Sequence, residues 1–276
     1  MDLRELLLPG GIGLSRIKVY DQPGPDGIIA GGAHFHSVSA ESYFVIAGTG
    51  ELELLSFQGF EVVKLEPNKV VYFRPGVIHR VCNPNKNLVI LSIMQNGGVA
   101  ERTDFFLTFP THVIANSESY RAAMVARTLP EAIKRRDLSI EGYRVLREAM
   151  ENEPATGREM LQSLYERARE IMKAKFSGLE WFINNCVFPE AKASYDAIEF
   201  LRDGRIAYLQ QAQWAQAIPA SLQEFDGITG RVMPYAAGHR ATPEALESPA
   251  SLSSEVPTQN RPGKFPLYTA DGAAQS

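Results

Sequence analysis

The sequence predicts a mainly β protein with an α-helical part, in which an antiparallel barrel or sandwich comes first and helices follow. Two observations carry this prediction. Before Pro110, short runs rich in Val, Ile, Tyr and Phe alternate with clusters of Gly, Pro and Asn, as is typical of strands joined by turns. After Pro110, helix formers dominate the sequence. The predicted regions are a β-barrel in 1–110, a helical region in 111–218 and a flexible or disordered tail in 219–276.

The β region contains eight short apolar segments at close spacing, with no helical pattern among them. Such an arrangement favours an antiparallel barrel or sandwich over an α/β fold. The predicted strands are Leu14–Tyr20, Ile28–His36, Tyr43–Ala47, Glu51–Phe57, Phe60–Leu65, Val70–Phe73, His79–Cys82 and Leu88–Met94.

The region after Pro110 is rich in helix formers and has few clusters of β-branched residues. Thr156 and Glu159 form a capping-box pattern, which predicts that a helix begins there. These helices form either a second domain or a cover laid on the barrel. The predicted helical segments are Asn116–Thr128, Pro130–Arg136, Ser139–Asn152, Thr156–Lys175, Gly178–Phe188 and Glu190–Gln216. Beyond Pro219, periodicity gives way to a Pro-rich polar sequence, which predicts the tail.

Composition and charge exclude several classes of protein. The 276 residues are 45% hydrophobic and 22% charged, which is ordinary for a globular protein and excludes collagen, a coiled coil and a wholly disordered chain. The formal net charge of −4, with only Arg135-Arg136 as a basic cluster in the helices, argues against nucleic acid as a partner. No apolar run has the length of a membrane span, and the first residues do not resemble a secretory signal. Because Cys82 and Cys186 form no paired motif, we expect a reducing, cytoplasmic location.

Three histidines and one glutamate form the most informative pattern in the chain. His34 and His36 are two residues apart, so on one strand they point to the same side, and Glu41 follows shortly after. His79 comes after a Pro-Gly turn, near the start of a later strand. Three imidazoles and one carboxylate suit a borderline divalent metal, namely Fe, Mn, Ni, Co, Cu or Zn. The pattern therefore predicts a metal site, but the types of donor atom do not identify the metal.

These two segments resemble the paired motifs of the cupin superfamily, and specifically single-domain cupins of the cupin 2 group. The resemblance covers residues 13–95. Four residues match the first motif in order and spacing: His34, His36, Glu41 and Gly48. Three match the second motif: Gly76, His79 and Asn83. The resemblance implies a jelly-roll β-barrel that holds a metal through the four ligand positions.

Two positions depart from the second motif. Asn68 stands where the motif has Gly, which is a mild change because Asn also adopts a left-handed backbone conformation. Arg74 stands where the motif has Pro, with Pro75 beside it. Arg74 could hold a substrate carboxylate or phosphate through its guanidinium, or it could be an ordinary surface arginine.

The resemblance leaves the reaction open, because cupins include dioxygenases, decarboxylases, sugar isomerases and epimerases, and non-enzymatic binding proteins. A dioxygenase-type enzyme acting on a small polar molecule is slightly favoured. A sugar or sugar-phosphate isomerase or epimerase is one alternative, and a non-catalytic ligand-binding cupin whose helices contact a partner is another. Tyr43, which shares the side of Glu41, is a candidate for hydrogen bonding or proton transfer, although it could also be a wall residue. Exposed barrel edges make a homodimer plausible.

Overall fold

The computed structural model describes residues 8–97, 99, 104–211, 217–219 and 225–236. Its strands are β1 Gly13–Val19, β2 His34–His36, β3 Glu41–Ala47, β4 Gly50–Ser56, β5 Gly59–Leu65, β6 Val70–Phe73, β7 Ile78–Cys82, β8 Val89–Met94, β9 Phe105–Leu107, β10 Ile218–Pro219, β11 Phe225–Asp226 and β12 Gly230–Ala236. Its helices are α1 Ser117–Met124, α2 Leu129–Asn152, α3 Pro154–Met172, α4 Phe176–Phe182 and α5 Phe188–Arg202. Short helical turns η2 Lys173–Lys175, η3 Ile183–Val187 and η4 Ala207–Gln211 complete the helical part.

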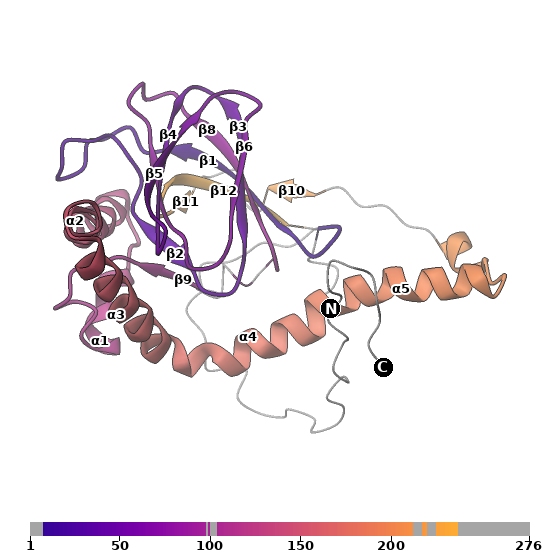
Figure 1. Cartoon of the computed structure of the whole chain (residues 1–276). Coiled ribbons are helices and arrows are strands. Elements are labelled where there is room, and N and C mark those ends of the chain that lie inside the picture. Colours follow the sequence, from indigo (N-terminus) through magenta and orange to yellow (C-terminus); the bar gives the residue numbers. More distant parts are fainter. Residues whose placement is uncertain (1–7, 98, 100–103, 212–216, 220–224, 237–276) are drawn as a thin grey trace.

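Two antiparallel sheets face each other and enclose one apolar core. The seven-stranded sheet has the order β10-β12-β1-β8-β3-β6, with β11 beside β12, and the five-stranded sheet has the order β5-β4-β7-β2-β9. Side chains from both sheets, among them Val45, Ile90, Leu52 and Val81, are fully buried between them. The expected β region followed by helices is therefore confirmed (Figure 1).

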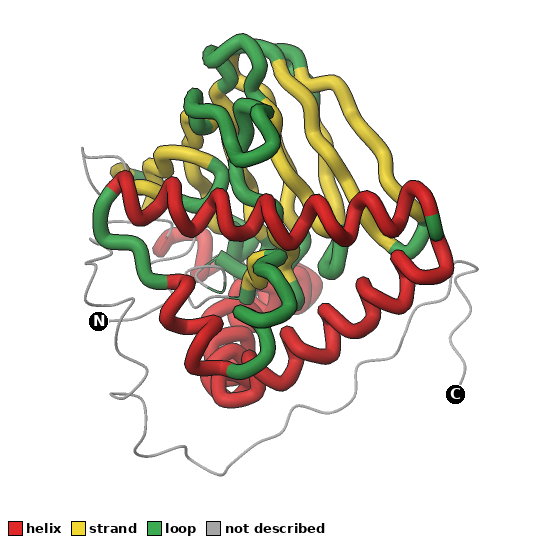
Figure 2. Tube along the Cα trace, turned by 90° about the vertical axis from the view of Figure 1, so that its left-hand side faces the viewer, coloured by secondary structure: helices red, strands yellow, loops and turns green. Residues whose placement is uncertain are grey.

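Helices α1, α2 and α3 cover the outer side of the five-stranded sheet, whereas α5 has no buried residue. Phe35 and Ile78 of that sheet pack in one core cluster with Tyr143 of α2 and Leu161 of α3. Seen from that side, the helices lie in front of the strands (Figure 2). Because the sheet is covered on both faces, every residue of β2 and β7 is buried. Of the two arrangements considered for the helices, the structure shows the cover laid on the sheet.

Part of the segment expected to be a flexible tail is a strand. β12 pairs with β1 over six consecutive positions, from Leu14 opposite Tyr235 to Val19 opposite Gly230. The prediction for 219–276 is therefore wrong for β11 and β12, while residues 237–276 lie outside the described residues. The local sequence conceals this strand because its partner lies about 200 residues earlier in the chain and because Pro234 interrupts the apolar pattern.

Turn positions explain two sequence features of the barrel. Asn68 has a φ of 70°, so Asn fills the left-handed position where the motif has Gly, as expected. Gly48 has a φ of 78°, and a Cβ there would collide with the Asn87 backbone carbonyl, so no other residue fits the turn before β4.

The capping-box prediction at Thr156 is wrong. α3 begins two residues earlier, after Glu153, and the Thr156 hydroxyl donates to the Glu153 carboxylate instead. A capping box is present at the start of α2, where Thr128 and Glu131 bond reciprocally. α2 also runs unbroken through the two shorter segments predicted for it. Within the described residues, no helix has the length and apolar character required to cross a bilayer.

Candidate metal centre

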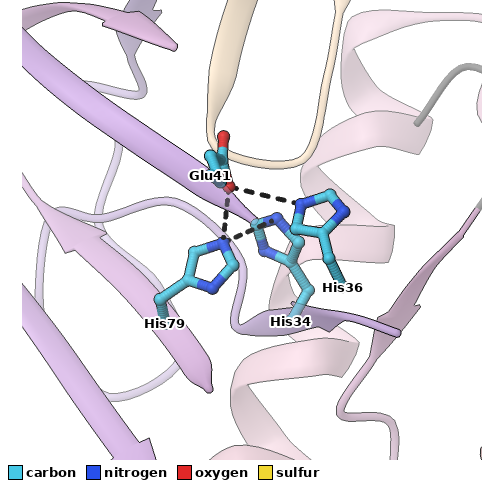
Figure 3. Close-up of side chains that lie close together, drawn as sticks. All are labelled: His34, His36, Glu41 and His79. Atoms are coloured by element: carbon cyan, nitrogen blue, oxygen red, sulfur yellow. Dashed lines mark hydrogen bonds and ion pairs between the residues drawn. The ribbon is translucent and has the colours of Figure 1, made fainter. Parts of the chain in front are cut away.

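The four predicted ligands meet inside the barrel, carried by three strands from both sheets. His34 and His36 lie on β2, and His79 lies directly opposite His34 on the neighbouring strand β7. Glu41 is the first residue of β3 in the facing sheet. All four side chains point toward one another (Figure 3). The sequence separation of two between the histidines of β2 places both rings on the inner face, as expected.

The donor atoms of these residues form one compact group. The Nε2 atoms of His79 and His34 are 3.1 Å apart. The Oε2 atom of Glu41 lies 3.2 Å from Nε2 of His79 and 3.3 Å from Nε2 of His36. One donor atom from each of the four residues lies within 4.8 Å of the others, and all four residues are buried.

The other ring nitrogen of each histidine fixes the orientation of its ring. Nδ1 of His34 bonds to the Gly32 carbonyl at 3.3 Å, and Nδ1 of His79 bonds to the Val77 carbonyl at 3.0 Å. Nδ1 of His36 bonds to Oδ1 of Asp104 at 2.9 Å. Because a carbonyl or an ionised carboxylate only accepts, each Nδ1 carries the proton and donates it. With Nε2 deprotonated, each ring would direct its Nε2 lone pair into the group, as metal-binding histidines do.

Glu41 is oriented in the same way. The hydroxyl of Ser92, on β8, donates to Oε1 of Glu41 at 2.6 Å, which leaves Oε2 for the centre of the group. Oε2 of Glu41 and Nε2 of His36 are buried and have no hydrogen bond of good geometry. Buried polar atoms without partners are costly, and a divalent cation between them would satisfy both. Three imidazoles and one carboxylate therefore fit a borderline divalent metal.

The electrostatics of the group favour positive charge at its centre. Burial opposes the ionised form of Glu41, but the imidazoles of His36 and His79 close to Oε2 hold the pKa of Glu41 well below its ordinary value. Burial lowers the pKa of His36, but the hydrogen bond to Asp104 and the nearby carboxylate of Glu41 outweigh burial and raise this pKa to about 10. Burial and the two neighbouring imidazoles hold the pKa of His34 well below its usual range. The carboxylates thus attract a cation, while His34 stays neutral and able to coordinate one.

Tyr43 lies next to this group, on the inner face of β3. Its side chain is 1% exposed, and its ring centroid is 6.0 Å from that of His79. Burial, and then the charge of Glu41, hold the pKa of Tyr43 well above its usual range, so the hydroxyl keeps its proton. A catalytic role for Tyr43 stays a prediction.

Arg74 lies elsewhere, in the turn between β6 and β7, where it is exposed to solvent. Its predicted contact with a substrate also stays a prediction.

Sequence reasoning missed Asp104 and Ser92, which orient His36 and Glu41. Asp104 is fully buried, and besides His36 it accepts from the backbone N–H of Ser39 at 3.0 Å. The available signal for Asp104 was a lone carboxylate at the start of the apolar run Phe105–Leu107, which forms β9. For Ser92 the signal was a small polar residue at an inward position of β8, between Ile90 and Met94.

Comparison with known proteins agrees with this architecture. Residues 23–94 match the family model described as Cupin domain. Among solved structures, a Cupin 2 conserved barrel domain protein from Salinispora arenicola shares 22% identity, covering 34% of this chain and 71% of that one, with a TM-score of 0.27. The DMSP lyase DddQ from Ruegeria pomeroyi shares 22% identity over 30% of this chain and 38% of its own, with a TM-score of 0.24. KdgF from Halomonas shares 18% identity over 24% of this chain and 57% of its own, with a TM-score of 0.22. The match therefore spans less than two thirds of the lyase and of KdgF, and no curated protein matches the chain.

Proposed function

We propose that this chain, which contains a cupin domain in residues 23–94, is a metal-dependent enzyme acting on a small polar organic molecule. One observation carries the proposal: donor atoms of His34, His36, Glu41 and His79 converge inside the barrel, and two of them lack hydrogen bonds. Each residue also makes a hydrogen bond through its other side-chain nitrogen or oxygen, which leaves the inward atom available to a metal.

The donor set suits Fe, Mn, Ni, Co, Cu or Zn. An ion of this kind, when bound, supplies Lewis-acid polarisation of a substrate oxygen and, if it is redox-active, electron exchange with dioxygen. Asp104 and Ser92 would keep the ligating atoms in place during turnover, since both are buried and hydrogen-bonded to ligands.

The walls around the group set the environment of a substrate. The Phe73 ring lies 4.2 Å from the His79 ring, and the Phe105 ring lies 6.3 Å from the His34 ring, centroid to centroid. These aromatic faces exclude water and strengthen the electrostatic interactions inside. Tyr43, which keeps its proton, would donate a hydrogen bond to a substrate oxygen or move a proton at its hydroxyl.

The surroundings favour dioxygenase-type oxidation, with dioxygen as co-substrate, over isomerisation of a sugar phosphate. A phosphate substrate calls for cationic side chains near the metal. The buried arginines of the described residues are Arg80 and Arg136. Arg80 binds Asp26 and Arg136 binds Asp137 and loop carbonyls, so neither is available to a substrate. A non-catalytic ligand-binding cupin, whose helices contact a partner, is the second candidate, because the helices α1–α4 give it a large additional surface.

Elemental analysis of protein purified without added metal tests the site. We expect about one ion per chain in the wild type, and loss of that ion in His34→Ala and in His79→Ala. His112→Ala is the matched control, because His112 is an exposed histidine outside the barrel, and it should retain the metal. Wild-type protein without bound metal, or metal retained in both ligand variants, would refute the site.

Turnover separates the candidate functions. Oxygen consumption during incubation with small acids, diketones and thiols would support the dioxygenase. Conversion of sugar phosphates without oxygen consumption would support an isomerase. Thermal stabilisation by a metabolite that is recovered unchanged would support the binding protein. Cell fractionation tests the expected cytoplasmic location.

A further inference from the structure

Helix α3 reaches the backbone segments that carry two of the four ligands. The hydroxyl of Tyr165, on α3, donates to the Gly76 carbonyl at 2.6 Å. Gly76 lies in the turn between β6 and β7, shortly before His79. The backbone N–H of Gly76 donates in turn to the His36 carbonyl at 2.8 Å. One side chain of the helix is therefore linked, through one glycine, to the segments that carry His36 and His79.

The same turn also orients the ring of His79. Tyr165 bonds to the peptide group that joins Gly76 to Val77, and the Val77 carbonyl bonds to Nδ1 of His79 at 3.0 Å. Because a peptide group is planar and moves as one unit, a displacement at the Gly76 carbonyl is passed to Val77. Displacement of the Val77 carbonyl would change the direction in which Nε2 of His79 points. The Tyr165 hydroxyl thus acts on a metal ligand through the backbone.

Aromatic contacts hold the Tyr165 ring in place. Its centroid lies 5.1 Å from that of Phe35, which stands between the two histidines of β2, and 5.8 Å from that of Phe57. Both contacts are made by the ring and need no hydroxyl. Removal of the hydroxyl alone therefore breaks the bond to Gly76 and keeps the packing of α3 against the sheet.

A second residue of α3 contacts the segment that follows His36. The Ser37 hydroxyl donates to the Asp104 backbone carbonyl at 2.7 Å, and Sδ of Met172 lies 3.6 Å from that hydroxyl. Met172 is buried. Tyr165 and Met172 are two helical turns apart, so they lie on the same face of α3. This face of the helix therefore supports both histidine-bearing segments.

We propose that Tyr165 is a positioning residue of the metal centre, which holds His36 and His79 in the arrangement that coordination requires through the turn at Gly76. Because this role presupposes a metal at the four ligands, it rests on the proposed function. It gives the helical cover a part in the site itself, since a residue of α3 sets the position of ligands on β2 and β7.

The variant Tyr165→Phe tests this role. Its matched control is Tyr20→Phe, because the Tyr20 hydroxyl donates to the Gly227 carbonyl at 2.7 Å, which is the same kind of bond to a turn that carries no ligand. Each variant loses one hydrogen bond, so both should lose a similar, small part of their stability. Only Tyr165→Phe should bind Co²⁺ more weakly, by roughly 3- to 10-fold, which corresponds to one hydrogen bond. Calorimetric titration of metal-free protein measures the affinities, and denaturant titration measures the stabilities.

Two further measurements follow the route from Tyr165 to the ligands. The visible absorption bands of the Co²⁺-loaded protein depend on the coordination geometry, and they should shift in Tyr165→Phe but match the wild type in Tyr20→Phe. In metal-free protein, the Gly76 amide should exchange its hydrogen roughly 3- to 10-fold faster in Tyr165→Phe, because the turn opens more often without the bond. Tyr20→Phe should leave this exchange unchanged.

The possible failures are distinguishable. Wild-type affinity and an unchanged Co²⁺ spectrum in Tyr165→Phe would overturn the positioning role and leave the proposed function intact. Equal losses of affinity in Tyr165→Phe and Tyr20→Phe would also overturn it, since the effect would then come from stability alone. Weaker binding without faster exchange at Gly76 would overturn the route through the turn. A wild type that binds no Co²⁺ would overturn both the positioning role and the metal centre on which it rests.

Discussion

His79 and Arg80 are adjacent on β7, and each belongs to a buried polar cluster on its own side of the sheet. His79 points into the barrel and meets His34 and Glu41. Arg80 points to the outside, as its position in the strand predicts, and binds Asp26 at 2.7 Å and Glu53 at 3.6 Å beneath α2. Arg147 of α2 adds a contact of 2.8 Å to Glu53. We call Asp26, Glu53, Arg80 and Arg147 the salt-bridge cluster.

The two clusters differ in charge balance. The salt-bridge cluster contains two acids and two bases, so its buried charges neutralise one another within the protein. The metal centre contains three imidazoles that face one carboxylate, and neither Arg80 nor Arg147 is bonded to it. A charge-balanced cluster stabilises the contact between the elements that carry it. A cluster of buried ligand atoms without balanced charges requires a bound ion to stabilise it. The comparison therefore indicates that Arg80 stabilises the fold and that His79 binds a metal, although both are buried polar residues on one strand.

The largest effect that this comparison predicts is the loss of stability when Arg80 is substituted. Arg80→Met removes the cation between Asp26 and Glu53 and leaves buried carboxylates unpaired, so the free energy of unfolding should fall by about 3–5 kcal/mol. Denaturant titration measures this loss. Arg147→Met is the matched control and should cost only about 1 kcal/mol, since Arg147 is 30% exposed.

Metal content separates the two sides of β7. Arg80→Met should retain its metal, because Arg80 does not reach the centre. If the folded Arg80→Met protein lost its metal, the two clusters would not be independent.

Removal of the metal should have the next largest effect. At free metal about 100-fold above the dissociation constant, binding to the folded state alone contributes about 2.7 kcal/mol, and a chelator should remove this contribution. Thermal unfolding with and without chelator measures the change. His79→Ala should show no chelator dependence, and a wild type whose melting temperature ignores the chelator would contradict the metal centre.

Local spacing predicted that His34 and His36 lie side by side, whereas the resemblance to the two cupin motifs was needed to join Glu41 and His79 to them. His34 and His36 share a strand face by parity alone, and the Pro-Gly turn before His79 and the left-handed Asn68 are readable from residue type. The barrel strands were predictable for the same reason, since Gly, Pro and Asn mark the turns between them.

Long-range pairing is what the sequence conceals. Asp104 reaches His36 across 68 residues, and β12 reaches β1 across about 200 residues. The prediction of where α3 begins was wrong for a different reason. Pro154 is favourable in the first helical turn, so the helix begins at Pro154 and Thr156 lies inside it.

Asp104 gives a prediction of intermediate size within the centre. Asp104→Ala removes the acceptor that holds the His36 ring, so metal affinity should fall 10–100-fold, or about 1.4–2.7 kcal/mol. Asp104→Asn keeps an oxygen that accepts from Nδ1 of His36 and should lose less. Calorimetric titration of metal-free protein measures both affinities. Equal affinities in the wild type and Asp104→Ala would show that β2 alone orients the ring.

The smallest effect is a pH dependence in the salt-bridge cluster. Burial opposes ionisation of Asp26, but its hydrogen bond with Arg80 outweighs burial and lowers the pKa of Asp26 in the folded protein. A lowered pKa stabilises the fold fully above the unfolded value of about 3.9, and this contribution is lost as the pH falls through the folded value. Asp26→Asn should therefore be less stable than the wild type by a constant amount between pH 5 and 8. The gap should close below about pH 4. Unfolding titrations of both proteins across this range measure the gap, and a gap that persists unchanged at the acid end would show that Asp26 contributes through packing rather than through its charge.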